Sequence, residues 1–305
     1  MTAQILVSRG GKVAFSDVYG YADVEAKQPL KADAIFRWAS MTKPVTCVAA
    51  MICYERGLFH LDDELSKYLP EWETTAVLAG GDADAPQLEA PATPITIKML
   101  LTHTSGITSL GLVQSEAARM MSRLMKQRVE EHGQAPSDLK EHCEFLASAP
   151  LVAQPGTLWH YGAGLTVLGR LCEVWSGQSF DVFLQQNLFE PLGMVDAGFR
   201  IPMTKLHRLC VRSSQFSTAV SCLHFLTDRS LPVGALPPVH SVQAYRYAGP
   251  QKMELVPSPT DGGQWTARGG VYDGSGGLAG TVADYFHFAQ MLANKGVGSN
   301  GTRIL

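Results

Sequence analysis

The stretch FRWASMTKP (residues 36–44) places a serine three residues before a lysine, where a strand-like segment gives way to a helix. On a helix, residues three apart lie on one face, with Cβ atoms about 5–6 Å apart. Lys43 can therefore reach the Ser40 hydroxyl, and a lysine set among apolar or cationic groups can lose its proton and act as a base. Pro44 suits the first helical turn, where the backbone N–H groups favour developing negative charge. The stretch thus predicts a serine nucleophile activated by a lysine.

The same four-residue spacing occurs a second time, as SDLK at residues 137–140. Spacing alone is therefore weak, and context separates the two copies. Ser40 follows an apolar strand-like segment and opens a helix with a buried stripe. Ser137 follows a polar, loop-like stretch, and we interpret it as the N-cap of a helix with Lys140 in solvent.

Other pattern matches are better explained by chance. The G-x-G-x-x-G spacing at 296–301 follows a helix and has no βαβ unit around it. The glycines of residues 274–277 lack the P-loop lysine, no G-x-S-x-G elbow occurs, and the histidines show no metal-ligand spacing. The sequence predicts no cofactor and no metal.

Composition narrows the function classes. The 305 residues are 46% hydrophobic and 17% charged, which provides for a sizeable core. The net charge is −3 with the basic residues scattered, so we expect no nucleic-acid partner. No apolar run is long enough to cross a bilayer, and residues 1–12 lack the apolar core of a secretory signal. With six isolated cysteines, these features predict a cytoplasmic, reducing location.

Periodicity predicts strands near the start and helices in the middle. Residues 4–21 have the pattern of a β-hairpin, and an apolar stripe over 45–53 marks a long helix that ends at Gly57. We expect a short helix at 62–69 and a loop at 71–94. Further helices are expected at 97–102, 115–131, 137–148 and 165–175, after Ser179, and at 281–294. This order argues for an α+β lobe interrupted by a mostly helical lobe.

Several segments together resemble the serine β-lactamase-like family, in its class C branch with carboxylesterases and transesterases. They are FRWASMTKP at 36–44, the segment 61–70, the specific ITIKMLLTHTSG at 95–106, the stretch 155–161, FEPLGM at 189–194 and the segment 276–292. The resemblance implies a β-lactamase/transpeptidase-like α+β fold, an antiparallel sheet flanked by helices plus a mostly helical lobe. It also places Ser40 at the family's nucleophile position.

The resemblance assigns further residues. Tyr161 stands where the family has the tyrosine of Y-x-N, and a phenol there could relay a proton between nucleophile and leaving group. Without the family, a core tyrosine would be the more ordinary interpretation. Ala163 replaces the asparagine of the β-lactamases proper, which suits esterase-like members better than antibiotic hydrolysis. We interpret His103 as a packing residue of its signature.

The family's third motif, K-T-G or H-x-G on a strand near the C-terminus, has no counterpart in its usual place. We therefore expect a single domain, 1–305, whose C-terminal strands are missing. Residues 1–98 and 265–305 would form the α/β lobe, and 99–264 the mostly helical lobe. Residues 210–243 interrupt the resemblance, either as a real loop or as an artefact of the gene structure. We expect this 305-residue form to have little activity and poor solubility.

The sequence thus predicts a serine hydrolase that acts on a small-molecule ester or amide through an acyl-enzyme on Ser40, with Lys43 and Tyr161. The alternatives are a catalytically silent scaffold or interaction protein of this fold, or an incomplete fragment of an active enzyme. Substrate identity and oligomeric state stay open.

Overall fold

The structure is a computed structural model, and it describes residues 2–23, 26–110, 115–210, 246–247, 253–254 and 271–305. The chain divides into two compact units. Unit 1 comprises 1–38, 186–267 and 278–305, and unit 2 comprises 39–185 and 268–277. The divisions at Ala39 and Gln186 differ from the lobe boundaries, 98 and 264, expected from the sequence. Ser40 therefore belongs to the same unit as the helices that follow it.

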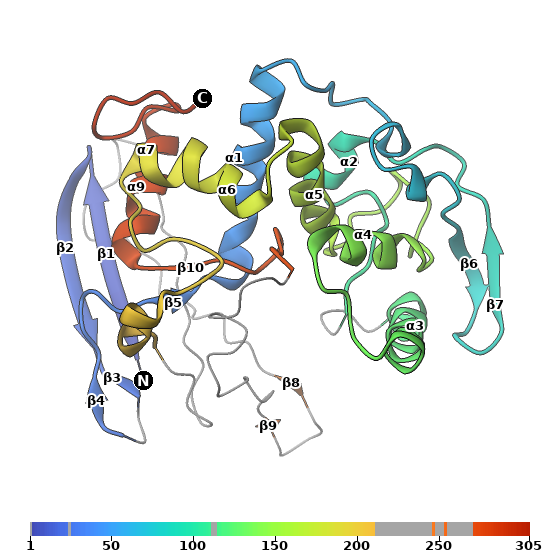
Figure 1. Cartoon of the computed structure of the whole chain (residues 1–305), viewed down its shortest axis with the longest axis horizontal. Helices are drawn as coiled ribbons and strands as arrows, with labels where there is room; N and C mark the ends of the chain where they lie inside the picture. Colours follow the sequence, from blue (N-terminus) through green and yellow to red (C-terminus); the bar gives the residue numbers. More distant parts are fainter. Residues whose placement is uncertain (1, 24–25, 111–114, 211–245, 248–252, 255–270) are drawn as a thin grey trace, which may run out of the picture. The chain divides into compact units, whose positions relative to one another are not determined.

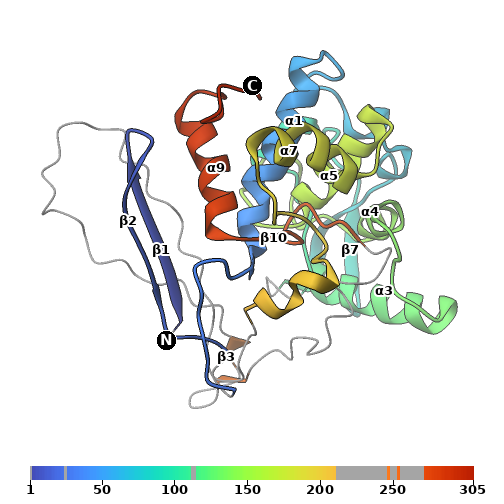
Figure 2. The same ribbon diagram turned by 60° about the vertical axis from the view of Figure 1, so that its left-hand side comes forward.

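Unit 1 contains the opening hairpin of β1 (Ala3–Arg9) and β2 (Lys12–Tyr19), an antiparallel pair as predicted. Helix α9 (Val282–Ala293) lies beside β1 (Figure 2) and begins with the expected capping box, in which Thr281 and Asp284 bond each other's backbone N–H. β5 (Phe36–Arg37) pairs with β10 (Ala279–Gly280). The remaining described elements are β3 (Tyr21–Asp23), β4 (Gln28–Pro29), α7 (Glu190–Leu192), η5 (Met203–Arg208), β8 (Arg246–Tyr247) and β9 (Met253–Glu254).

The hairpin carries apolar side chains on both of its faces. Leu6 and Val18 pack on the unit 1 core, a cluster of Ala22, Leu30, Ala34, Phe36, Cys210 and Val282. Side chains alternate between the faces of a strand, and the opposite face exposes Ile5, Val7 and Phe15, each by 44–47%. In the described part of the chain, this apolar face of the two-stranded sheet is therefore exposed to solvent.

Unit 2 is built around the packing of α1 (Thr42–Glu55) on α5 (Gly164–Ser176) (Figure 1). The predicted stripe of α1 is buried, and Gly57 follows its C-cap with φ +71°. Around this pair lie η1 (Ala39–Met41), η2 (Leu65–Lys67), η3 (Pro70–Trp72), α2 (Ile97–Leu101), α3 (Glu116–His132), α4 (Leu139–Ala147), α6 (Phe180–Leu184), and the strands β6 (Val77–Gly81) and β7 (Pro86–Glu89).

Three local predictions were wrong. Residues 71–94 are not all loop, because β6 and β7 form a hairpin whose exposed, glycine-containing strands lack a clear apolar alternation. The predicted helix at 62–69 is the short 3₁₀ turn η2, followed by η3. Asp138, not Ser137, caps α4, because its carboxylate accepts from the Glu141 N–H. The helix predicted after Ser179 does form, as α6 and α7 joined by a π-helical turn, η4 (Gln185–Phe189), and Gly193 ends α7 with φ +69°.

Several sequence predictions fall on residues that the structure does not describe. Nearly all of the 210–243 interruption lies there, as does Cys222. In the described part, Cys47, Cys53, Cys143, Cys172 and Cys210 are free thiols, four of them buried. No helix among the described residues is long and apolar enough to cross a membrane.

Candidate functional site

Ser40 lies in η1, the 3₁₀ turn that leads directly into α1. The turn begins at Ala39, whose φ of +47° is in the left-handed region that non-glycine residues rarely adopt. This bend leaves Ser40 exposed, while Met41 and Lys43 on either side of Thr42 are only 8% exposed. Such local strain is common where a structure holds a functional group in place.

Lys43 and Tyr161 both reach the Ser40 hydroxyl. The Lys43 Nζ lies 3.3 Å from the Ser40 Oγ, and the Tyr161 hydroxyl donates to the same Oγ at 2.6 Å. The Lys43 Nζ also sits 4.6 Å from the centre of the Tyr161 ring, an arrangement that attracts a cation to the aromatic face. The three residues predicted from the sequence are therefore brought together, all within unit 2.

The segment of residues 103–108 holds Tyr161 in position through backbone hydrogen bonds. The His160 N–H donates to the His103 carbonyl at 2.8 Å, and the Ala163 N–H donates to the Thr108 carbonyl at 3.4 Å. A Cβ on Gly162 would overlap the Ile107 carbonyl oxygen, so only glycine lets the two segments approach this closely. The signature at 95–106 thus supports the backbone on which Tyr161 stands.

His103 contacts the Tyr161 ring, with ring centres 5.0 Å apart. Its own φ of +57° is left-handed. Burial, reinforced by the nearby positive charge of Lys43, lowers the pKa of His103. A neutral imidazole packed on the phenol fits the packing role expected from the sequence.

A loop at residues 273–277 completes the surroundings of Lys43, and sequence reasoning missed it. Lys43 donates to the Ser275 carbonyl at 2.6 Å, and Thr46, one turn along α1, donates to the Gly274 carbonyl at 2.8 Å. In the sequence this loop showed only a glycine-rich pattern that is not a P-loop. Its place at the start of the family-like 276–292 stretch was the one available signal.

The second S-x-x-K copy has different surroundings. The Lys140 side chain is 62% exposed and pairs with Glu144 at 3.5 Å, four residues along α4. The Ser137 N–H donates to the Glu141 carboxylate. Ser137 and Lys140 are thus a helix-entry residue and a solvent residue, and they provide matched controls for Ser40 and Lys43.

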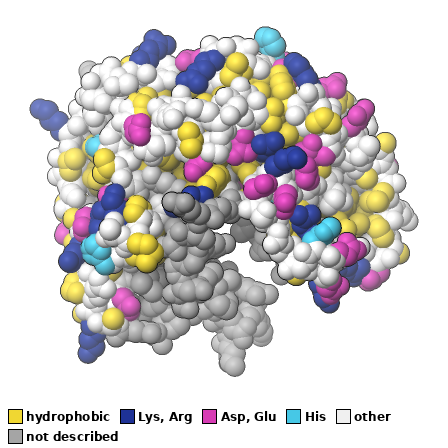
Figure 3. Space-filling view, viewed as in Figure 1, with side chains coloured by type: hydrophobic (Ala, Val, Ile, Leu, Met, Phe, Trp, Pro, Cys, Tyr) yellow, Lys and Arg dark blue, Asp and Glu magenta, His cyan; other side chains and the backbone are white. Residues whose placement is uncertain are grey.

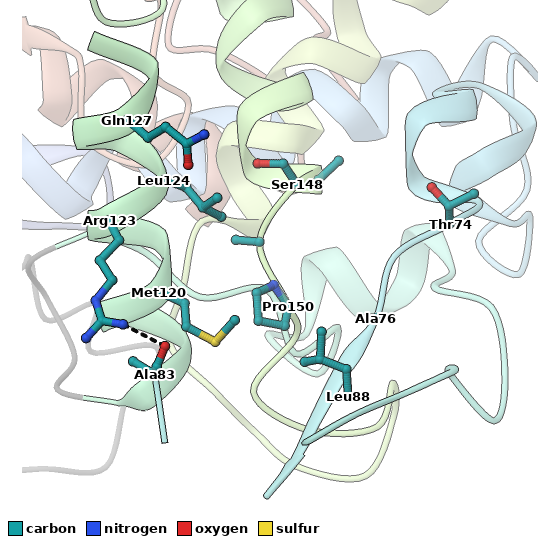
Figure 4. A pocket seen from close by; sticks show the side chains of 12 residues that line it. Thr74, Ala76, Ala83, Leu88, Met120, Arg123, Leu124, Gln127, Ser148 and Pro150 are labelled. Atoms are coloured by element: carbon teal, nitrogen blue, oxygen red, sulfur yellow. Dashed lines mark hydrogen bonds between the residues drawn. The ribbon is translucent and has the colours of Figure 1, made fainter. Parts of the chain in front are cut away.

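A pocket of about 480 Å³ lies in unit 2, between α3, the β6–β7 hairpin and residues 147–150 (Figure 4). Met120, Leu124 and Leu88 form its apolar walls, and Arg123 at its edge bonds the Ala83 carbonyl and Asp84. No residue of the Ser40 site lines this pocket, so the pocket is separate from that site.

Two further observations bear on ligands. In the described ranges, no group of three or more His, Cys, Asp or Glu side chains is arranged to hold a metal ion. On the face drawn in Figure 3, Lys and Arg side chains are interspersed with Asp and Glu. The part of that face formed by described residues presents no extended surface of one charge.

Comparisons with known proteins agree with this fold. The sequence profile described as "Beta-lactamase" matches residues 2–304. A lovastatin esterase of Penicillium rubens is 39% identical over 180 residues, 59% of this chain and 43% of that protein. Esterase EstB of Burkholderia gladioli is 35% identical over 199 residues, 65% of this chain and 46% of that protein. Unliganded LovD, the simvastatin synthase of Aspergillus terreus, superposes with a TM-score of 0.67 at 24% identity, over 95% of this chain and 63% of that one.

The chain therefore belongs to the beta-lactamase family and has its β-lactamase/transpeptidase-like α+β fold, as the resemblance predicted. Its relatives include esterases and acyltransferases. The chain spans under half the length of the curated relatives that it matches.

Proposed function

We propose that this protein is a serine hydrolase or acyltransferase that acts on carboxylic esters through an acyl-enzyme on Ser40. The observation that carries the proposal is the convergence of a lysine amine and a tyrosine hydroxyl on one exposed serine oxygen, at 3.3 and 2.6 Å. A serine hydroxyl is a weak nucleophile by itself and needs such a base beside it.

These three residues account for each proton that is transferred in the reaction. The Ser40 Oγ attacks the ester carbonyl carbon while its proton passes to the Lys43 Nζ, which accepts it in the amine form. The Ser40 backbone N–H, at the start of a helix, can donate to the developing oxyanion. As the tetrahedral intermediate collapses, Tyr161 gives its proton to the departing alkoxide and takes the proton from Lys43. Water or a second alcohol then attacks the acyl-enzyme by the reverse route and releases an acid or a new ester.

Esters are favoured over β-lactams as substrates. Ala163 caps the N-terminus of α5 in a buried position and offers no side-chain amide where the β-lactamases proper carry asparagine. The relatives named as a lovastatin esterase and a monacolin J acid methylbutanoyltransferase support the ester class. We expect faster turnover of a chromogenic short-chain ester than of a chromogenic cephalosporin.

The test is covalent labelling with a fluorophosphonate, together with hydrolysis of p-nitrophenyl butyrate. We expect the label on Ser40, and we expect Ser40→Ala to abolish both signals while Ser137→Ala, the matched copy, changes neither. Turnover that survives Ser40→Ala would exclude the proposal. Absence of labelling in the wild type would favour the silent scaffold instead.

A further inference from the structure

The Asp273 carboxylate bonds the loop whose Ser275 carbonyl accepts a hydrogen bond from Lys43. The Asp273 Oδ1 accepts the Ser275 backbone N–H at 2.8 Å and the Thr166 hydroxyl at 2.5 Å. The first bond closes a turn over residues 273–275 of the kind that aspartate side chains form with the backbone two residues on. The second is short, as expected for a hydroxyl that donates to a charged carboxylate.

Thr166 links this loop to α5. It is 2% exposed and lies in the first turn of the helix, where negative charge is stabilised by the helix dipole. Its hydroxyl also lies 2.8 Å from the Ser275 Oγ. Because Thr166 has one hydroxyl proton and gives it to Asp273, the Ser275 hydroxyl supplies the proton of this second bond.

The loop is held from the other side by α1. Thr46 donates to the Gly274 carbonyl at 2.8 Å, and a Cβ on Gly274 would come within 2.5 Å of the Leu165 carbonyl oxygen. Residues 273–275 are therefore fixed between α1, which carries Lys43, and α5, which follows Tyr161. The Ser275 carbonyl that accepts the Lys43 N–H belongs to this fixed loop.

The direction of the Lys43 lone pair follows from this contact. A neutral amine has two N–H donors and one lone pair. When the Ser275 carbonyl binds one N–H at 2.6 Å, rotation about the last side-chain bond is restricted, so the lone pair can be kept toward the Ser40 Oγ at 3.3 Å. A displaced carbonyl would allow the amine to turn away, and small misplacements of a reacting group cost large factors in rate.

We propose that Asp273 and Thr166 are positioning residues for the Lys43 base: they fix the Ser275 carbonyl that orients the Lys43 amine toward Ser40. This inference rests on the proposed function, and it adds two residues that act through Lys43 without touching a substrate. The hydrogen bonds, rather than the negative charge itself, do the positioning, since both donors end on one carboxylate oxygen.

The kinetic test compares Asp273→Ala with Asp273→Asn, whose amide oxygen keeps an acceptor for both donors. We expect kcat to fall about 10- to 100-fold in Asp273→Ala with little change in KM, because only the alignment of the base is lost. Asp273→Asn should recover most of this loss. Thr166→Val should show a smaller loss of the same kind.

The matched control is Asp284→Ala, or Thr281→Val if that variant does not fold. Asp284 also accepts a threonine hydroxyl, at 2.8 Å, and a backbone N–H, at 3.0 Å, but in the capping box of α9 in unit 1. It should lower the melting temperature without the selective loss of kcat. Equal kcat in Asp273→Ala and this control, or no recovery in Asp273→Asn, would overturn the positioning role.

A second readout does not depend on turnover. Trace acetylation by isotope-labelled acetic anhydride, read by peptide mass spectrometry, reports the reactivity of the Lys43 amine, with Lys140 as internal reference. Loss of the carbonyl acceptor should raise Lys43 acetylation several-fold in Asp273→Ala and leave Lys140 unchanged.

If the wild type fails to label with fluorophosphonate, the proposed function fails, and acetylation still decides the positioning role. Unchanged Lys43 acetylation would then contradict it.

Discussion

The Tyr161 hydroxyl donates to the Ser40 Oγ across 2.6 Å, although 121 residues separate the two in the chain. The distance lies at the short end for a bond between two hydroxyl groups. It places a proton donor at the atom from which a leaving group would depart in the proposed reaction. The Tyr161 ring also lies near the Lys43 amine and the rings of His103 and Trp159.

We predict that Tyr161→Phe lowers the rate of ester turnover by roughly 10²–10⁴, as is typical when a general acid or base is removed. Stopped-flow or steady-state hydrolysis of p-nitrophenyl esters measures it. Tyr68→Phe serves as the control, because Tyr68 also donates a short bond, to Asp63 at 2.6 Å, outside the site. A near wild-type rate in Tyr161→Phe would show that Tyr161 is a packing residue and not a proton donor in the reaction.

Ser40→Ala and Lys43→Ala should each remove most of the activity, and the double variant should be little worse than either. Both residues belong to one proton-transfer unit, and losses within such a unit do not add. Kinetics of the two single variants and the double variant form the cycle, with Lys140→Ala as the control for removing a lysine. Near-additive losses would show that the two side chains act separately.

Gly162→Ala should destabilise the fold by roughly 1–3 kcal/mol or more, as overpacking does, and should displace Tyr161. The reason is the overlap of an added Cβ with the Ile107 carbonyl oxygen. Gly164→Ala is the comparison, since its Cβ would approach the Leu100 carbonyl only to 3.3 Å. Chemical denaturation measures both, and equal stability of the two variants would contradict the predicted overlap.

Stability should fall when the pH drops below about 6.5. Burial lowers the pKa of His103, His142 and His160 from 6.5, with Asp273 opposing this at His142. The unfolded chain then binds more protons in this range, so the stabilisation is present above pH 6.5 and is lost as the pH falls through the lowered values. Urea unfolding at several pH values measures the slope, which His142→Asn should reduce. A free energy of unfolding that stays constant between about pH 5 and 7 would refute this assignment.

The exposed face of the β1–β2 hairpin should cause self-association. Val7 and Phe15 are opposite each other on this face and are 47% and 45% exposed. Exposed apolar strands favour association with other chains. The double variant Val7→Thr, Phe15→Thr should sediment closer to a monomer at unchanged stability.

Leu6→Thr gives the matched control on the opposite face of the same strand. Leu6 packs against the unit 1 core, so its loss should lower stability by about 1–2 kcal/mol without improving solubility. If both sets of variants behave alike in sedimentation and melting, the two faces do not differ as the structure indicates.

Local chemistry in the sequence predicted much of this protein. The hairpin, α1 with its buried stripe, α3, α5 and the capping box of α9 follow from alternation, helical spacing and caps, which depend only on neighbouring residues. Ser40 and Lys43 could be paired for the same reason, since one helical turn brings them together. Tyr161 was placed by family resemblance, because nothing local shows that residue 161 meets residue 40.

Tertiary structure decided the contacts between distant segments. The β6–β7 hairpin forms on weak local patterns, and Val77 makes a bridge to Leu151, so its partners lie outside its own sequence window. The loop at 273–277 could be linked to the site only from the fold, in which Lys43 and Thr46 of one helix and Thr166 of another bond to it. Side-chain and backbone hydrogen bonds act over about 3 Å. A sequence pattern can therefore predict those between near neighbours, while the fold alone fixes those between residues a hundred or more positions apart.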